Sequence, residues 1–316
     1  MGGRMVRVED VLGRVSMWAG QTVTHGPLTG GLSHQIWRVI DMRGRSFVLR
    51  VLEPAVSAAG LGVPPPLEIE NTLHAAESGV GARVYEVLPD VPALVLEFLP
   101  GRTLDPAAVR EAATIPRVAA ACRRLHAGPR FANDFDITVK LHELLDICRR
   151  NDLRLPADYL DRLSTVEKVR AALAAAPLNT VPCHNDLLAE NFIDVAGTIR
   201  IVDYQLSGNN DPTFELGDIA AEADFDPDRA GALAAAYFGS ELNSALIARV
   251  RLNLLLSNAT WTLWFSVHHG LLRNPESDFD YWAEAADKWA QAVRDMDAPD
   301  LGRLMEAAAG RTSLHP

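Results

Sequence analysis

A short stretch near the middle of the chain, HNDLLAENFIDVAGTIRIVDY (residues 184–204), places three polar residues beside apolar segments. These residues are Asp186, Asn191 and Asp203. The segments ENFIDV and TIRIVDY flank a short turn, a pattern typical of a small β-hairpin. Because the two ends of a hairpin lie side by side, we expect Asn191 and Asp203 to meet at one point. An unpaired buried carboxylate is costly, so these groups must lie on exposed turns or bind something positive.

The three side chains suit one kind of chemistry. Carboxylate and amide oxygens are ligands that Mg²⁺ prefers, and this ion binds through few protein groups together with substrate phosphates. Asn191 and Asp203 are therefore predicted metal ligands. Asp186, on the loop before the hairpin, is free to orient a hydroxyl group and accept its proton. This division of roles belongs to phosphoryl transfer.

The elements that must position these residues fall into two groups. Before residue 100, apolar runs at 35–41, 46–52 and 93–99 predict strands, and the segment 67–79 predicts a helix. After residue 100 the periodicity is mainly helical, and the predicted helices are 105–128 with an interruption at Pro116, 138–150, 157–175 and most of 214–310. We therefore predict an α+β fold with two lobes. Residues 1–99 form a small sheet-rich N-terminal lobe, and residues 100–316 form a larger, mainly helical C-terminal lobe.

Composition narrows the class of protein. The 316 residues carry a formal net charge of −11 and are 48% hydrophobic, which argues against the basic surface that a nucleic acid requires. The scattered Cys122, Cys148 and Cys183 lack metal-ligand spacing, so a reducing compartment fits best. We find no signal peptide and no apolar run long enough to span a membrane. The expected location is cytoplasmic.

At the level of motifs, the chain resembles the choline/ethanolamine kinases, within the aminoglycoside-phosphotransferase branch of the protein-kinase-like fold. HNDLLAENFI is similar to their catalytic loop, IVDYQLSGNNDPTFELGDIA to their metal-binding segment, LTGGLSHQIWRV (28–39) to their phosphate loop, and LVLEFLPGRTL to their hinge. The resemblance covers roughly residues 28 to 290. It implies ATP and Mg²⁺ as cofactors and the positions that contact ATP: Gly30, Gly31, Ser33, Arg50, Glu68, Glu97 and Leu99.

Within that set, two kinds of contact are expected. The resemblance places Arg50 beside the nucleotide phosphates, with an acidic partner that is either Glu68 or Glu70, because spacing alone does not choose between them. Glu97 and Leu99 would contact adenine through backbone groups.

Three neighbours of the motif are interpreted as supports of the loop. His184 is expected to hold the catalytic loop by hydrogen bonds rather than to act as a base. Asp211 and Asp218 are expected to cap and brace it.

The resemblance also implies a pocket for a small cationic alcohol. Trp261 and Trp264 are three residues apart on one helical face, and they, with Tyr281 and the acidic Glu222, would surround an ammonium group by cation–π and charge attraction. Choline is the first expectation, and an ethanolamine, aminoglycoside or other amino-alcohol kinase is the alternative.

Some positions depart from the family pattern. Gln205 and Leu206 stand where the family has an acid and an aromatic, and Glu284 stands near its last cage aromatic. These departures would make the cage smaller or more polar. A pseudokinase serving as a nucleotide-binding module is a further alternative, although the intact Asp186, Asn191 and Asp203 argue against it.

Overall fold

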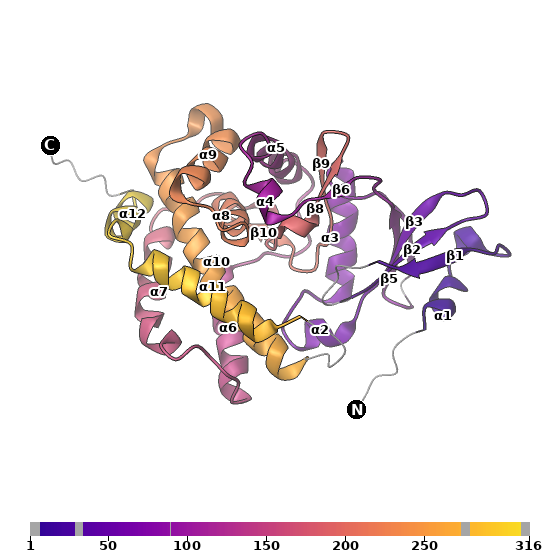
Figure 1. Cartoon of the computed structure of the whole chain (residues 1–316), viewed down its shortest axis with the longest axis horizontal. Helices are drawn as coiled ribbons and strands as arrows, with labels where there is room; N and C mark the ends of the chain where they lie inside the picture. Colours follow the sequence, from indigo (N-terminus) through magenta and orange to yellow (C-terminus); the bar gives the residue numbers. More distant parts are fainter. Residues whose placement is uncertain (1–6, 29–33, 89, 273–278, 311–316) are drawn as a thin grey trace.

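The computed structural model describes residues 7–28, 34–88, 90–272 and 279–310 of the 316-residue chain. An antiparallel sheet forms the N-terminal part, and helices form most of the C-terminal part (Figure 1). The predicted α+β arrangement is therefore confirmed.

The N-terminal sheet has the strand order β1-β2-β3-β5-β4, with every neighbouring pair antiparallel. Its strands are β1 (Thr24–Pro27), β2 (Gln35–Ile40), β3 (Ser46–Val51), β4 (Val84–Leu88) and β5 (Ala93–Glu97). A helix, α1 (Val8–Leu12), and a 3-10 turn, η1 (Ser16–Trp18), cover one face of the sheet with apolar side chains. Arg50 lies on β3, which has a partner on each side, so the sheet holds this residue firmly.

The link between the two parts runs through α3 (Pro65–Glu77), which follows the short α2 (Pro54–Ala58). The fully buried Asn71 of α3 donates hydrogen bonds to Asn133 Oδ1 (2.8 Å) and Ser207 Oγ (2.9 Å), and accepts one from the Ala132 N–H (2.9 Å). All three partners belong to the C-terminal part. Consequently α3, which carries Glu68, is fixed against the helical part.

The C-terminal helices pack around one long helix. They are α4 (Pro106–Val109), α5 (Ile115–His126), α6 (Ile137–Arg150), α7 (Tyr159–Ala174), α8 (Pro212–Glu222), α9 (Pro227–Phe238), α10 (Ser244–Leu271), α11 (Tyr281–Met296) and α12 (Leu301–Ala308), with the 3-10 turns η2 (Ala189–Asn191) and η3 (Gly239–Glu241). The predicted interruption of the helical stretch 105–128 is present, because α4 ends at Val109 and α5 begins at Ile115. Pro116 lies in the first turn of α5, where proline is tolerated.

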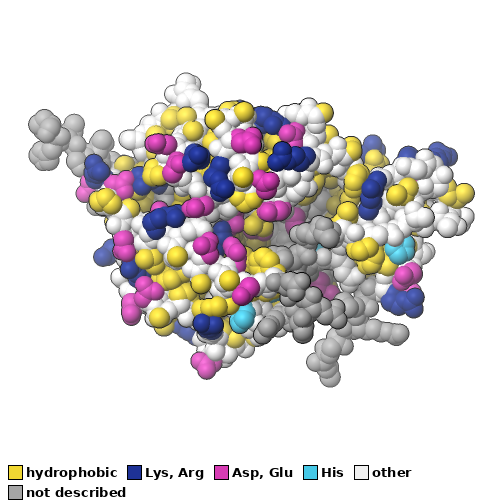
Figure 2. All heavy atoms as spheres, in the orientation of Figure 1, with side chains coloured by type: hydrophobic (Ala, Val, Ile, Leu, Met, Phe, Trp, Pro, Cys, Tyr) yellow, Lys and Arg dark blue, Asp and Glu magenta, His cyan; other side chains and the backbone are white. Residues whose placement is uncertain are grey.

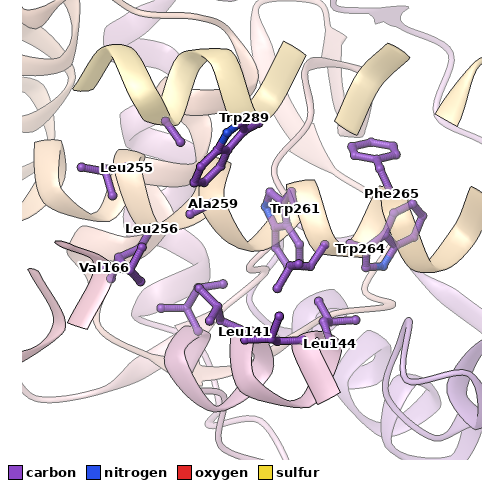
Figure 3. Packing of buried hydrophobic residues seen from close by; sticks show 14 of the residues in the cluster. Leu141, Leu144, Val166, Leu255, Leu256, Ala259, Trp261, Trp264, Phe265 and Trp289 are labelled. Atoms are coloured by element: carbon purple, nitrogen blue, oxygen red, sulfur yellow. The ribbon is translucent and has the colours of Figure 1, made fainter. Parts of the chain in front are cut away.

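Residues 252–268 of α10 are all buried, because helices surround it on several sides. Figure 3 shows Trp261, Trp264 and Phe265 of α10 lying above Leu141 and Leu144 of α6. A helix buried all round belongs to the centre of a large core. This position makes α10 a rigid support for whatever its side chains line.

Helix α8 crosses α10 at very short range. A Cβ atom at Gly217 would lie 2.6 Å from the Leu254 backbone nitrogen, so only glycine allows this approach. The contact brings Asp218, on the same helix, within hydrogen-bonding distance of Trp261 of α10, and Glu222 lines one cavity together with Trp261 and Trp264.

Three short strand pairings complete the C-terminal part. The hairpin of β8 (Phe192–Val195) and β9 (Thr198–Ile201) is joined by β6 (Arg102–Thr103), and β7 (Val181–Cys183) pairs with β10 (Gly208–Asn210). The predicted hairpin is therefore present, and it turns at Ala196 and Gly197, both with positive φ.

The outer surface is mixed in character. On the face shown in Figure 2, acidic and basic side chains are interspersed over the helical part. Among the described residues, no helix has both the length and the apolar character needed to cross a membrane.

Candidate active site

The hairpin brings the predicted chemical residues together. Asn191 immediately precedes β8 and Asp203 follows β9, and the Val202 N–H donates to the Asn191 carbonyl oxygen (3.1 Å). Asn191 Nδ2 donates to the backbone oxygen of Asp186 (2.8 Å). Asp186, Asn191 and Asp203 all line one cavity of about 410 Å³.

The loop that carries Asp186 is held from behind by His184. This fully buried ring lies 2.9 Å from the Val202 carbonyl oxygen, which can only accept, so its Nε2 carries the proton. Its Nδ1 then accepts from the Asp186 N–H at 3.3 Å. Burial lowers the pKa of His184 and keeps the ring neutral. These bonds are the ones expected of a support for the loop.

Glu215, which sequence reasoning missed, supports the same loop from α8. Its carboxylate is fully buried and accepts from the backbone N–H groups of His184 (2.8 Å) and Asn185 (2.7 Å). His126 and Cys183 adjoin it, with ligand atoms within 4.8 Å of one another. Through its two bonds to the backbone, Glu215 braces the catalytic loop.

Asp218 ties the loop to α10. Its side chain accepts from the Leu187 N–H, Ser257 Oγ and Trp261 Nε1, each at 2.7 Å. Burial, together with the charge of Glu222, raises the pKa of Asp218 to about 7. These bonds fasten the loop to the aromatic helix.

The pKa of Asp186 is also raised. Burial is the main cause, and the carboxylates of Asp218, Glu222 and Asp203 add to it. A cation bound in the cavity would favour the ionised form of this carboxyl group.

Arg50 connects the sheet to the hairpin. Its Nε and Nη2 donate to Glu68 Oε1 (3.0 and 2.8 Å), and its Nη1 donates to Asp203 Oδ2 (3.0 Å). Glu70 is exposed, so the structure chooses Glu68 as the partner that the sequence left open. Burial works against the charge of Arg50, but Asp203 and Glu68 more than offset it and raise its pKa. His34, for which the sequence predicted no role, has its Nε2 3.3 Å from Glu68 Oε2.

Of the remaining residues predicted to contact the nucleotide, the structure describes Glu97 and Leu99. Gly30, Gly31 and Ser33 lie outside the described residues. The Glu97 carboxylate accepts from the Arg83 N–H and pairs with Arg200, each at 3.1 Å. The side chain of Leu99 is buried. Both side chains are thus engaged by the protein, which leaves backbone groups for any contact with a base.

Aromatic and acidic side chains line the same cavity. Trp261 and Trp264 line it, and their indole N–H groups are bound to Asp218 Oδ1 (2.7 Å) and the Leu61 carbonyl oxygen (3.1 Å). Figure 3 shows these two rings and Phe265 projecting from α10. The predicted departures Gln205, Leu206 and Glu284 line the cavity as well, as do Glu190, Phe265 and Phe279.

Phe265 and Phe279 differ in whether the sequence signals their place in the cavity. Phe265 is four residues from Trp261, so helical spacing could have found it. Phe279 follows the undescribed segment 273–278 and carries no local signal.

Tyr281 needs a correction. It is not among the residues that line the cavity; instead it is buried and stacks on His268 with ring centroids 4.0 Å apart and planes 8° apart. The first turn of α11 packs this ring against α10, because α11 lies along that helix. Tyr281 therefore supports the aromatic wall from behind.

Glu222 lines the cavity as predicted in position, but it has a partner. Its Oε1 lies 2.7 Å from Lys288 Nζ, and the two side chains are 6% and 3% exposed. Lys288 belongs to α11 and does not itself line the cavity. No pattern in the sequence pointed to this pair, because its two helices are far apart along the chain.

The chain is similar to several known proteins. The model of the phosphotransferase enzyme family matches residues 24–252. A choline/ethanolamine kinase family protein from Mesorhizobium loti is 30% identical, with a TM-score of 0.82 over 96% of this chain and 98% of that chain. Protein LicA of Haemophilus influenzae is 25% identical over 257 residues, which is 76% of this chain and 73% of that protein.

Choline kinase LicA from Streptococcus pneumoniae shares the fold, with 18% identity and a TM-score of 0.75 over 92% of this chain and 98% of that chain. A further structure of LicA is in complex with AMP. The predicted kinase-like fold is thereby confirmed. With a family match over most of its length and a relative that covers nearly all of it, the chain belongs to the phosphotransferase enzyme family and is a choline/ethanolamine kinase-like phosphotransferase.

Proposed function

We propose that this protein transfers the γ-phosphate of ATP, with Mg²⁺, to the hydroxyl group of a small cationic amino alcohol. Choline and ethanolamine are the first acceptors to test, with other amino alcohols and aminoglycosides after them. One observation carries the proposal: Asp186, Asn191 and Asp203 line a cavity that is also lined by aromatic and acidic side chains. Phosphoryl chemistry and recognition of a cation thus share one chamber.

We assign the nucleotide to the junction of the two lobes, residues 1–99 and 100–316. Arg50 is fixed on the sheet and points its guanidinium at the hairpin, where phosphates would lie beside it. The AMP found in a LicA structure supports a nucleotide site of this kind. ATP would contact the backbone near Glu97 and Leu99.

The donor set fits Mg²⁺. Asn191 uses its Nδ2 to hold the Asp186 backbone, so the amide's oxygen is the atom left for a ligand. Asp203 shares Arg50 with Glu68, so two carboxylates face one cation, and Asp203 keeps acceptor positions and negative charge for a metal ion. Asn191 and Asp203 would hold the ion, which neutralises phosphate charge when bound.

Asp186 is the group proposed to act on the acceptor. Its backbone is held by His184 and Asn191, so its carboxylate has a defined place in the cavity. A carboxylate with a raised pKa holds a proton more readily, which suits a group that must take the proton of the attacking hydroxyl. Most of the rate would still come from positioning and charge neutralisation.

A coupled ATP-consumption screen tests the proposal. The purified protein is incubated with ATP, Mg²⁺ and choline, ethanolamine, other amino alcohols or aminoglycosides, and the phosphorylated product is detected directly. Turnover with a cationic alcohol that disappears in Asp186→Asn supports the proposal. Binding of ATP without turnover of any acceptor would indicate a nucleotide-binding module instead.

A further inference from the structure

The charge of Glu222 is already balanced by the protein. Its carboxylate is paired with the Lys288 ammonium at 2.7 Å, and both side chains are nearly inaccessible. A buried carboxylate requires a partner, and a carboxylate that has one loses much of its attraction for a second cation. Glu222 therefore presents little net charge to the cavity that it lines.

Glu284 is in the opposite situation. It lines the same cavity, one helical turn before Lys288 on α11. Within the described part of the chain it has no hydrogen bond or ion pair for its carboxylate. Burial raises its pKa, and the charges of Glu222, Asp287 and Glu190 add to this, while Lys288 works against it. A cation in the cavity would relieve this unfavourable charge.

The aromatic rings offer little free surface to a cation. Trp261 and Trp264 are only 3% and 8% exposed, and hydrogen bonds at their indole N–H groups fix both in the wall. Cation–π attraction requires that a cation reach the face of a ring. Recognition by a carboxylate is therefore the stronger option here.

We propose that Glu284 is the residue that binds the ammonium group of the acceptor, and that Lys288 is a positioning residue that keeps Glu222 out of this role. This inference rests on the proposed function. A carboxylate accepts hydrogen bonds from N–H groups, and charge-assisted bonds of this kind are the strong ones. A quaternary ammonium has no N–H to donate. The protein thus selects protonated amines that keep at least one N–H.

A methylation series tests the inference, because charge and hydroxyl group stay constant while N–H groups are lost. The acceptors are ethanolamine, N-methylethanolamine, N,N-dimethylethanolamine and choline, compared by kcat and KM at saturating ATP. For the wild type we expect the largest fall in kcat/KM at the last step, from the dimethyl compound to choline. Glu284→Gln should cost ethanolamine about 10- to 100-fold, mainly in KM, because it loses a charge-assisted hydrogen bond. The same change should cost choline less than about threefold.

Two further variants separate Glu284 from its neighbours. Asp287→Asn removes an exposed carboxylate from the same helix outside the cavity and should leave all four acceptors unchanged. Lys288→Met with Glu222→Gln removes both members of the buried pair together, which avoids stranding a single charge. Because Glu222 is not the binding group, this double variant should rank the four acceptors as the wild type does. The ratio of kcat/KM for ethanolamine to that for choline should stay within about threefold of the wild-type ratio.

Each contrary result has a distinct meaning. A wild type that prefers choline, with Glu284→Gln affecting all four acceptors equally, overturns the inference but leaves the kinase intact. Loss of the amine preference in the double variant would assign the ammonium to Glu222 instead and also overturn it. Failure to turn over any of the four, or any other acceptor of the screen, would remove the proposed function and the inference with it.

Discussion

Replacing Asp211 by alanine should lower the stability of the helical part while leaving Mg²⁺-dependent nucleotide binding in place. Asp203→Ala should instead abolish Mg²⁺-dependent nucleotide binding at a smaller cost in stability. Both acids follow the hairpin, yet their surroundings differ. Asp203 lines the cavity beside Asn191, whereas Asp211 begins α8 and pairs with Arg249 of α10.

The magnitude follows from what Asp211 holds. It caps α8 by accepting from the Thr213 N–H (2.8 Å) and Oγ1 (2.6 Å), and the loss of such a cap costs about 1 kcal/mol. It also pairs with Arg249, whose side chain is 5% exposed. Breaking a buried pair costs about 3–5 kcal/mol. The lower end applies, because the Asp211 side chain is 19% exposed and Arg249 keeps bonds to the Leu173 and Ala176 carbonyl oxygens.

We therefore expect Asp211→Ala to lower the free energy of unfolding by about 4 kcal/mol, corresponding to a fall in Tm on the order of 10 °C. Asp203→Ala should cost less, because Arg50 retains Glu68. Urea unfolding and thermal melting measure the first effect, and titration with a fluorescent nucleotide, with and without Mg²⁺, measures the second.

Matched variants sharpen the comparison. Asp211→Ser keeps a capping oxygen but loses the ion pair, so it should recover about 1 kcal/mol relative to alanine. Asp161→Ala removes an exposed acid of α7 and should stay within about 0.5 kcal/mol of wild type. If Asp211→Ala abolishes the Mg²⁺ dependence at unchanged stability, or if both variants lose it equally, the distinction between brace and ligand is wrong.

Four further predictions rest on other contacts. Asp186→Asn should nearly abolish turnover with ATP affinity roughly intact, because an amide cannot accept the hydroxyl proton; steady-state kinetics and nucleotide titration decide this. Trp264→Leu should change the KM for choline and for ethanolamine by less than about threefold, because the ring is only 8% exposed and offers a cation little of its face; a rise of roughly 30-fold for choline alone, equal to ~2 kcal/mol, would show that the ring face does bind the ammonium group. Burial lowers the pKa of His268 from 6.5 to about 4, so its neutral form contributes stability above pH 6.5 that is lost as the pH falls through 4, about 3 kcal/mol in all. Unfolding of His268→Phe should accordingly depend less on pH over that range than unfolding of the wild type. Gly217→Ala should cost about 1–3 kcal/mol by forcing α8 away from α10; a melting curve like that of the wild type would show that the two helices have room to move.

Much of the site is local in sequence, and that part was predictable. A hairpin with a two-residue turn determines its own register, so recognising the hairpin was enough to bring its two ends together, with Asn191 opposite Val202 and Asp203 one residue further on. Trp261 and Trp264 reach the same cavity because helical spacing puts them on one face of α10. The α+β fold class followed from strand-like periodicity before residue 100 and helical periodicity after it.

Other features depended on packing between elements distant in the chain. The choice of Glu68 over Glu70 required the orientation of α3, which Asn71 fixes against the helical part. Tyr281 turned toward His268 because α11 lies along α10, a placement that no short pattern encodes. The pairing of Glu222 with Lys288 required α8 and α11 to pack together, because the two residues are 66 positions apart in the chain. Periodicity determines which face of a helix is buried, but only the tertiary structure decides which charge lies opposite it, since that depends on how helices cross.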